Sequence, residues 1–151
     1  MTTLLSFISR PAGNNKVMRS LPAYLLFWLV LMVLAIGNGI ARESLYGSGL
    51  SDLQSHQMST VTGMLVTGAA VWAFSHFWMP PDSVREAALI GLAWLVFTVA
   101  FEFLFGRFVA GHSWEQLFQD YNLFAGRLWL VFLVWLTILP YATFKLHRSA
   151  T

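Results

Sequence analysis

The residues from 87 to 108 read AALIGLAWLVFTVAFEFLFGRF, and this stretch decides the fold class. Its only charged side chains, Glu102 and Arg107, lie close to its end. About 20 apolar residues are enough for a helix to cross the hydrocarbon core of a membrane. A single strand would leave its backbone N–H and C=O groups unpaired in lipid, so a helix is the form required. The stretch therefore predicts a transmembrane helix.

Three more apolar stretches of similar length occupy residues 21–41, 58–79 and 128–144. Charged residues make up 11% of the chain, against about 25% in a soluble domain. Such a chain cannot cover a water-facing surface in the usual way. The sequence predicts an all-α, four-transmembrane-helix bundle with one membrane domain at 21–144 and short tails at 1–20 and 145–151.

Lysine and arginine predict the orientation, because loops on the cytoplasmic side carry more of them. Six lie in the two tails and the second loop, and three lie in or beside the first and third loops. This predicts that both ends are cytoplasmic (N-in/C-in). The basic residues are scattered rather than gathered in a groove, so no nucleic-acid partner is expected. The first group is Arg10, Lys16, Arg19, Arg85, Lys145 and Arg148, and the second is Arg42, Arg107 and Arg127.

The loop between the third and fourth predicted helices has its own pattern. Ser113-Trp114-Glu115-Gln116 is typical of a capping box, in which Ser113 caps a helix and Gln116 caps Ser113 in return. Apolar and polar side chains then occupy opposite helical faces. This predicts a short amphipathic helix over 113–125, lying along the outer membrane interface.

Polar side chains concentrate near the outer ends of the predicted helices. If the orientation is right, they form one polar cluster in the outer leaflet, and this cluster is the candidate site. Its members are Asn38, Arg42, Glu43, His56, Glu102, Arg107, His112, Asp120, Asn122 and Arg127.

Glu102 is the most informative member of this cluster. It precedes Phe108 by six residues, which places it about 9 Å inside the helix end. A carboxylate is costly in hydrocarbon, so Glu102 should face the bundle. We expect Arg42 as its partner, with Arg127 as second choice. Either the carboxylate fixes helix packing through such a pair, or it titrates or binds a polar ligand.

Small residues and aromatic residues at the span ends have simpler interpretations. Gly91, Thr98, Glu102 and Gly106 share one helix face, as do Ser59, Gly63 and Thr67 on the second helix. The second stripe predicts close helix packing. The aromatic side chains Tyr24, Trp28, Trp78, Trp129 and Tyr141 fit membrane-interface belts and need no further role.

The sequence predicts no metal and no cofactor. The chain has no cysteine, which excludes disulfides and thiolate ligands. His56 and His112 lack the spacing and the third ligand of a metal site. No nucleophile elbow is present, so catalysis is uncertain and not favoured.

The pattern FEFLFGRF at 101–108, AGHSW at 110–114, DYN at 120–122 and GRLW at 126–129 resembles an uncharacterised family of small bacterial four-span membrane proteins. The resemblance implies four spans, an outer polar cluster and a place in the bacterial inner (plasma) membrane. It implies no activity.

Three functions fit these observations. The favoured one is an accessory or scaffold subunit that binds a larger membrane-protein partner. The second is a small transporter or channel, working as a homo-oligomer with Glu102 as the coupling site. The third is a lipid- or quinone-binding membrane enzyme whose head-group site includes the arginines. Membrane lipids are expected partners in every case.

Overall fold

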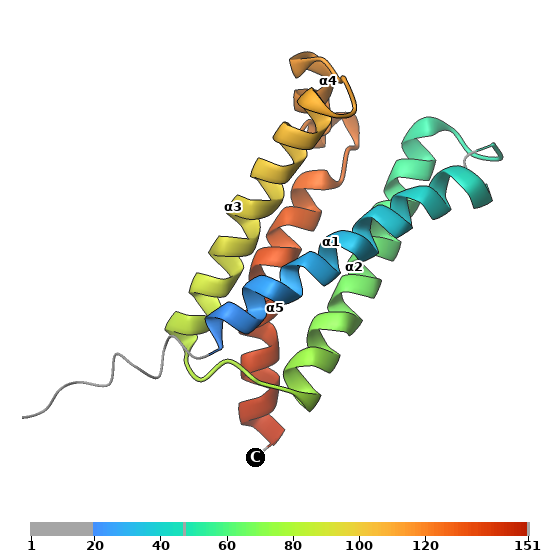
Figure 1. Ribbon diagram of the computed structural model, residues 1–151. Coiled ribbons are helices and arrows are strands. Elements are labelled where there is room, and N and C mark those ends of the chain that lie inside the picture. The colour runs from blue at the N-terminus through green and yellow to red at the C-terminus, as the bar shows by residue number, and fades with distance from the viewer. Residues whose placement is uncertain (1–19, 47, 151) are drawn as a thin grey trace, which may run out of the picture.

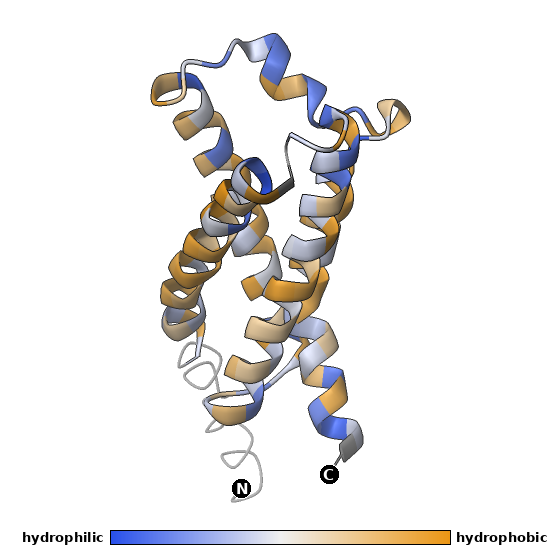
Figure 2. Ribbon diagram, turned by 90° about the vertical axis from the view of Figure 1, so that its right-hand side faces the viewer, coloured by the Kyte–Doolittle hydropathy of each residue, from blue (hydrophilic) through white to orange (hydrophobic). Residues whose placement is uncertain are grey.

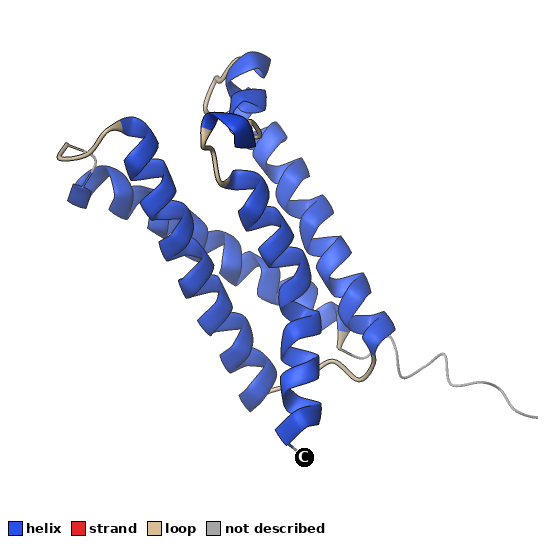
Figure 3. Cartoon of the chain, turned by 180° about the vertical axis from the view of Figure 1, so that it is seen from behind, coloured by secondary structure: helices blue, strands red, loops and turns tan. Residues whose placement is uncertain are grey.

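The computed structural model describes residues 20–46 and 48–150, and this part of the chain contains helices and no strands (Figure 3). Four helices are long and apolar enough to cross a membrane. They are α1 (Leu21–Ala41), α2 (Asp52–Phe77), α3 (Val84–Phe108) and α5 (Trp129–Ala150). The all-α fold and the four apolar helices are thus confirmed, while most of the predicted N-terminal tail lies outside the described residues.

Helix caps set the observed boundaries. Helix α2 begins at Asp52 rather than at 58, because Ser51 and Gln54 form a capping box there. Ser83 caps α3, accepting a hydrogen bond from the Glu86 backbone N–H at 3.1 Å. These polar first turns extend the helices beyond their apolar stretches.

The connections at the other helix ends are short. Helix α1 continues into a π-helical turn, η2 (Arg42–Tyr46). The segment predicted as one helix at 113–125 is divided into α4 (Trp114–Gln119) and the 3-10 turn η3 (Leu123–Ala125). Ser113 and Gln116 form the expected capping box at its start. Gly126 ends η3 with a φ of +79°, a left-handed conformation that glycine adopts without strain.

The bundle has two ends, seen in Figure 1. The "C-terminal end" contains the start of α1, the α2–α3 connection and the end of α5. The "α4 end" contains η2, the start of α2, α4 and the start of α5. Helix α1 starts beside the start of α3 and diverges from it toward the α4 end. Hydrophilic residues concentrate in the connections at the α4 end and near the end of α5, while the helices between are mostly hydrophobic (Figure 2).

Much of the core lies in the part of the bundle nearest to its C-terminal end. Tyr24, Val71, Ile90 and Trp94 are fully buried. Helices α3 and α5 come so close at Gly91 that an added Cβ would lie 2.1 Å from the Thr137 carbonyl oxygen. Only glycine fits this crossing, so Gly91 fixes how tightly the two helices pack.

Candidate functional site

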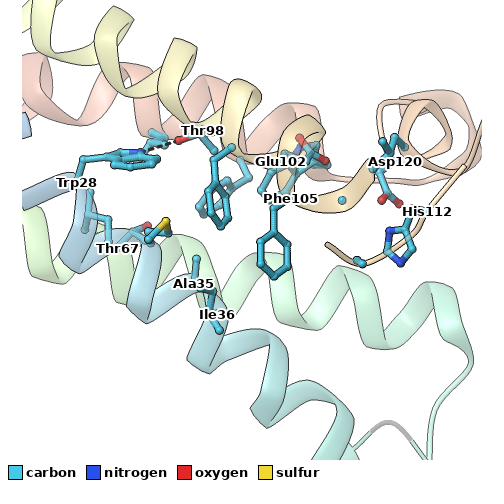
Figure 4. Close-up of a pocket in the computed structure, with 18 of the residues that line it drawn as sticks. Trp28, Ala35, Ile36, Thr67, Thr98, Glu102, Phe105, His112 and Asp120 are labelled. Carbon is cyan, nitrogen blue, oxygen red and sulfur yellow. Dashed lines mark hydrogen bonds between the residues drawn. The ribbon is translucent and has the colours of Figure 1, made fainter. Parts of the chain in front are cut away.

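A cavity of about 360 Å³ lies where α1 diverges from α3 (Figure 4). On the side of the cavity nearest to the C-terminal end of the bundle, Trp28 Nε1 of α1 donates a hydrogen bond to Thr98 Oγ1 of α3 at 3.0 Å. Most of the wall is apolar, from α1, α3 and α5. The exposed lining residues Ile36 and Phe105 stand on α1 and α3, so the cavity reaches the protein surface between these helices.

Glu102 is the carboxylate of this cavity. Its Oε2 accepts hydrogen bonds from Tyr121 Oη at 2.5 Å and from Trp129 Nε1 at 2.8 Å. Within residues 20–46 and 48–150, no donor reaches its Oε1 and no cation lies within 4.0 Å of it. One carboxylate oxygen therefore stays available for a further partner.

The expected ion pair between Arg42 and Glu102 does not form. The Arg42 guanidinium instead contacts the exposed Glu43, with Nη2 to Oε1 at 3.3 Å. The second choice, Arg127, is also wrong, since its partners are Asp120 and Asp52. Helix α1 diverges from α3 toward the α4 end (Figure 1), and Arg42 directly follows the last residue of α1, so the divergence takes Arg42 away from α3.

Tyr121 connects the α4 segment to α3 through its bond to Glu102. Burial raises the pKa of the Tyr121 phenol, and the hydrogen bond to Glu102 raises it further. The phenol therefore remains protonated at neutral pH and acts as a donor. Tyr121 also stacks against Phe103, with ring centroids 5.8 Å apart.

A charged cluster beside the cavity joins α2 to the α4 segment. Asp120 Oδ1 lies 3.4 Å from His56 Nε2 and accepts from Arg127 Nη1 at 3.2 Å. Arg127 Nη2 also lies 3.6 Å from Asp52 Oδ2. Gln57 Nε2 donates to the Gly126 carbonyl at 3.0 Å. These contacts hold the α4 end of α2 against the start of α5, and Arg127 balances the charge of Asp120.

A second cavity of about 140 Å³ adjoins the first between α1 and α2. Both cavities are lined by Ala35, His56 and Trp129, so they are neighbours. Arg42 and Asn38 line the second cavity. The Asn38 side-chain amide donates to the Ser59 carbonyl at 2.7 Å, which ties α1 to α2.

The ten residues of the predicted cluster are thus divided by the structure. Glu102, His56, His112 and Asp120 line the main cavity, Arg127 contacts Asp120, and Asn38 and Arg42 line the second cavity. The other three lie elsewhere: Glu43 is exposed, Arg107 donates to the His112 carbonyl, and Asn122 caps η3. That these residues act as one functional cluster remains a prediction.

The interpretation of the aromatic residues as interface belts is wrong for Tyr24, while Trp28 and Trp129 are partly exposed and also form contacts inside the bundle. Tyr24 is fully buried and its hydroxyl donates to the Met79 carbonyl at 2.7 Å. The Trp28 indole N–H donates to the Thr98 hydroxyl, and the Trp129 indole N–H donates to the Glu102 carboxylate. Hydropathy places all three near span ends but gives no sign of their inward direction. Trp78 and Tyr141 are exposed.

Sequence reasoning also missed Glu86, near the start of α3. It is 1% exposed, and it accepts hydrogen bonds from the Ser20 hydroxyl and from the Asp82 backbone N–H. The available signal was its position three residues after the cap Ser83, which is the capping-box spacing.

No three His, Cys, Asp or Glu side chains among the described residues come together in a way that could hold a metal ion. Comparisons of the chain with models of known protein families, with curated proteins and with solved structures found no match. A function therefore has to be inferred from the cavity and its side chains.

Proposed function

We propose that the chain is a four-span integral membrane protein that binds the polar end of an amphiphilic, membrane-dissolved molecule. The observation that carries this proposal is the cavity of about 360 Å³, with an apolar wall and one incompletely satisfied carboxylate, Glu102. Ligand sites in proteins are typically about 300–1,000 Å³, mostly apolar, with a few fixed polar groups.

The position of the opening favours a ligand that arrives from the membrane. Ile36 and Phe105, on opposite sides of the opening, are each 45% exposed. Both belong to helices that are apolar enough to cross a membrane. In this arrangement the ligand's polar end lies near Glu102 and His56, and its apolar part leaves between α1 and α3. An ionisable side chain inside a membrane span is by default a functional-site candidate.

We further propose that both ends are cytoplasmic, that the membrane is the bacterial inner membrane, and that the segment 113–125 lies along its outer interface. The excess of basic residues in the tails and second loop supports this orientation. The exposed Trp114, Phe118 and Phe124 are suited to an interface. Alkaline phosphatase fused after Thr151 should be inactive, and the enzyme inserted at Gly111 should be active. The reverse result would invert the orientation.

Mass spectrometry of the purified protein tests the binding function. The wild type, extracted in mild detergent, should retain an amphiphile in stoichiometric amount. Ala35→Phe places a ring into both cavities and should reduce retention at least about tenfold, which corresponds to about 1.4 kcal/mol. The control Ala100→Phe adds the same ring at an exposed position of α3 and should retain the ligand.

Two outcomes would contradict this function. In one, the wild type carries only lipids in the proportions of the surrounding membrane. In the other, Ala35→Phe retains the same molecule as fully as Ala100→Phe does.

A second candidate is the accessory subunit, which the uncovered surface of α1 favours. Of the 21 residues of α1, the structure buries Tyr24 and Leu31. Val33, 64% exposed, would lie at an interface with a transmembrane partner. A stoichiometric membrane protein that copurifies with the wild type and with Ala100→Trp, but not with Val33→Trp, would support this role. Copurification unchanged by Val33→Trp would exclude α1 as the contact.

A further inference from the structure

We infer that the polar end of the ligand is an organic cation, an ammonium or phosphonium group on an apolar body, bound against Glu102. This inference rests on the proposed function and names the chemistry of the ligand's head group. Three observations carry it: the charges around the cavity, the aromatic side chains of its wall, and the free oxygen of Glu102.

The carboxylates at the α4 end differ in whether a cationic side chain neutralises their charge. Asp120 and Asp52 contact Arg127, Glu43 contacts Arg42, and Glu115 is exposed to solvent. Glu102 receives hydrogen bonds from two neutral donors, and no cation of the described chain lies within 4.0 Å of it. Neutral donors satisfy oxygen atoms but do not cancel a charge. An unpaired charge in an apolar surrounding is costly, and a bound cation would remove that cost.

The wall of the cavity is rich in aromatic side chains. Five of them come from three helices, and they face the same space as Glu102. Cations are attracted to aromatic faces within about 6 Å, most strongly to tryptophan. The five are Trp28 from α1, Phe101 and Phe105 from α3, and Trp129 and Phe132 from α5. This wall accommodates the apolar substituents of an organic cation and adds attraction for its charge.

An anionic head group would be poorly placed in the same cavity. It would meet Glu102 and Asp120, which are both lining residues. Two arginines contact lining residues: Arg127 already contacts two carboxylates, and Arg107 donates to the His112 carbonyl. Arg42 lies in the neighbouring cavity and contacts Glu43.

The unoccupied oxygen of Glu102 gives the cation a defined position. Tyr121 and Trp129 both bond to Oε2, and this leaves Oε1 for the ligand. An ammonium N–H can donate to Oε1, and a quaternary cation can approach it through charge alone. Tyr121 and Trp129 act here as positioning residues, because both hold Oε2 in place.

Equilibrium dialysis with two probes of the same shape and opposite charge tests the inference. The purified full chain, in dodecyl maltoside without added lipid, is dialysed against tetraphenylphosphonium or tetraphenylborate, and uptake by protein-free micelles is subtracted. We expect the wild type to bind the phosphonium cation and not the borate anion. Glu102→Gln should weaken cation binding at least about tenfold, or about 1.4 kcal/mol. Glu115→Gln removes the same charge from an exposed site on α4 and should bind as the wild type does.

The two probes keep the inference falsifiable even if Glu102→Gln fails to fold, because the preference of the wild type is itself decisive. Equal binding of both probes, or binding of neither, overturns the cation inference. The amphiphile proposal then stands or falls separately on the molecule retained by the wild type and lost from Ala35→Phe.

A competition experiment distinguishes two sources of the cation. Displacement of bound tetraphenylphosphonium by phosphatidylethanolamine, but not by phosphatidylglycerol, would assign the site to the ammonium head of a lipid. Displacement by neither lipid would assign it to a free organic cation. Equal displacement by both lipids would show that the charge of the head group is not recognised, and would overturn the inference.

Discussion

The two ends of α3 each carry an embedded carboxylate, and the structure treats them in opposite ways. At the start of α3, which lies at the C-terminal end of the bundle, Glu86 is 1% exposed. The Ser20 hydroxyl and the Asp82 backbone N–H both donate hydrogen bonds to it. At the α4 end, Glu102 is partly exposed and borders a cavity of about 360 Å³. Glu86 is therefore a buried packing element, and Glu102 remains accessible to a ligand.

The difference comes from how closely the neighbouring helices approach α3. Near Glu86, glycine at position 91 lets α5 pack directly on the backbone of α3. Trp28 and Thr98 then form the last hydrogen bond between α1 and α3 before the cavity. Beyond this bond α1 diverges, so the same residue type on the same helix is a packing element at one end and a candidate ligand contact at the other.

The largest effect on stability is expected from Gly91→Ala, which disrupts the tight packing of α3 against α5 near Glu86. The new Cβ would lie 2.1 Å from the Thr137 carbonyl oxygen, a backbone atom that cannot move aside without separating α3 from α5. We expect a loss of about 3 kcal/mol in the free energy of unfolding, at the upper end for overpacked cores. Denaturant unfolding in detergent, followed by tryptophan fluorescence, measures it.

Gly37→Ala is the matched control for that substitution. A Cβ at Gly37 of α1 would meet nothing within 4 Å, and alanine favours a helix more than glycine does. This variant should unfold at the same denaturant concentration as the wild type or a higher one. If both variants were equally stable, α3 and α5 would not be in contact as described.

A smaller effect is expected from Glu86→Ala, which sharpens the comparison of the two carboxylates. Its loss leaves the buried Ser20 hydroxyl without its acceptor, a change that costs about 1–3 kcal/mol. Glu102→Ala should destabilise less, because Glu102 and its donor Trp129 line a cavity that other acceptors can enter. The same unfolding measurement would refute this contrast if Glu102→Ala proved the more destabilising of the two.

The sequence predicted the features that depend on composition and local chemistry. Four long apolar stretches were enough to identify the four candidate spans. The cap at Ser113 follows from local hydrogen bonding. Helical spacing also placed Gly91, Thr98, Glu102 and Gly106 on one face, and all four are buried or partly buried.

The partners of Glu102 depend on geometry that spacing does not contain. Periodicity gives the face of a helix, but not the angle at which α1 leaves α3, and that angle separates Arg42 from Glu102. Tyr121 reaches Glu102 because the chain turns back after α4 ends at Gln119. Trp129 reaches it from the first residue of α5. Neither contact follows a helical repeat, so pattern reasoning could not find them.

The smallest effect expected is a spectroscopic one, at the open end. Burial raises the pKa of Tyr121, and its bond to Glu102 adds to that increase. Comparing the tyrosinate absorbance of the wild type with that of Tyr121→Phe isolates this titration, which should occur above the pH of about 10 typical of free tyrosine. Glu102→Gln should lower its midpoint only in part, because burial is the larger cause.

The sign of the linked stability follows from the direction of this shift. A raised pKa means that the fold favours the neutral phenol, so its contribution to stability is complete below pH of about 10 and is lost as the pH rises through the folded-state pKa. The difference in unfolding free energy between the wild type and Tyr121→Phe should therefore be constant up to that pH and decrease above it. A Tyr121 titration at the pH of free tyrosine would instead mean that water fills the α4 end of the cavity. The surroundings of Glu86 and Glu102 would then differ in their access to water as well as in helix packing.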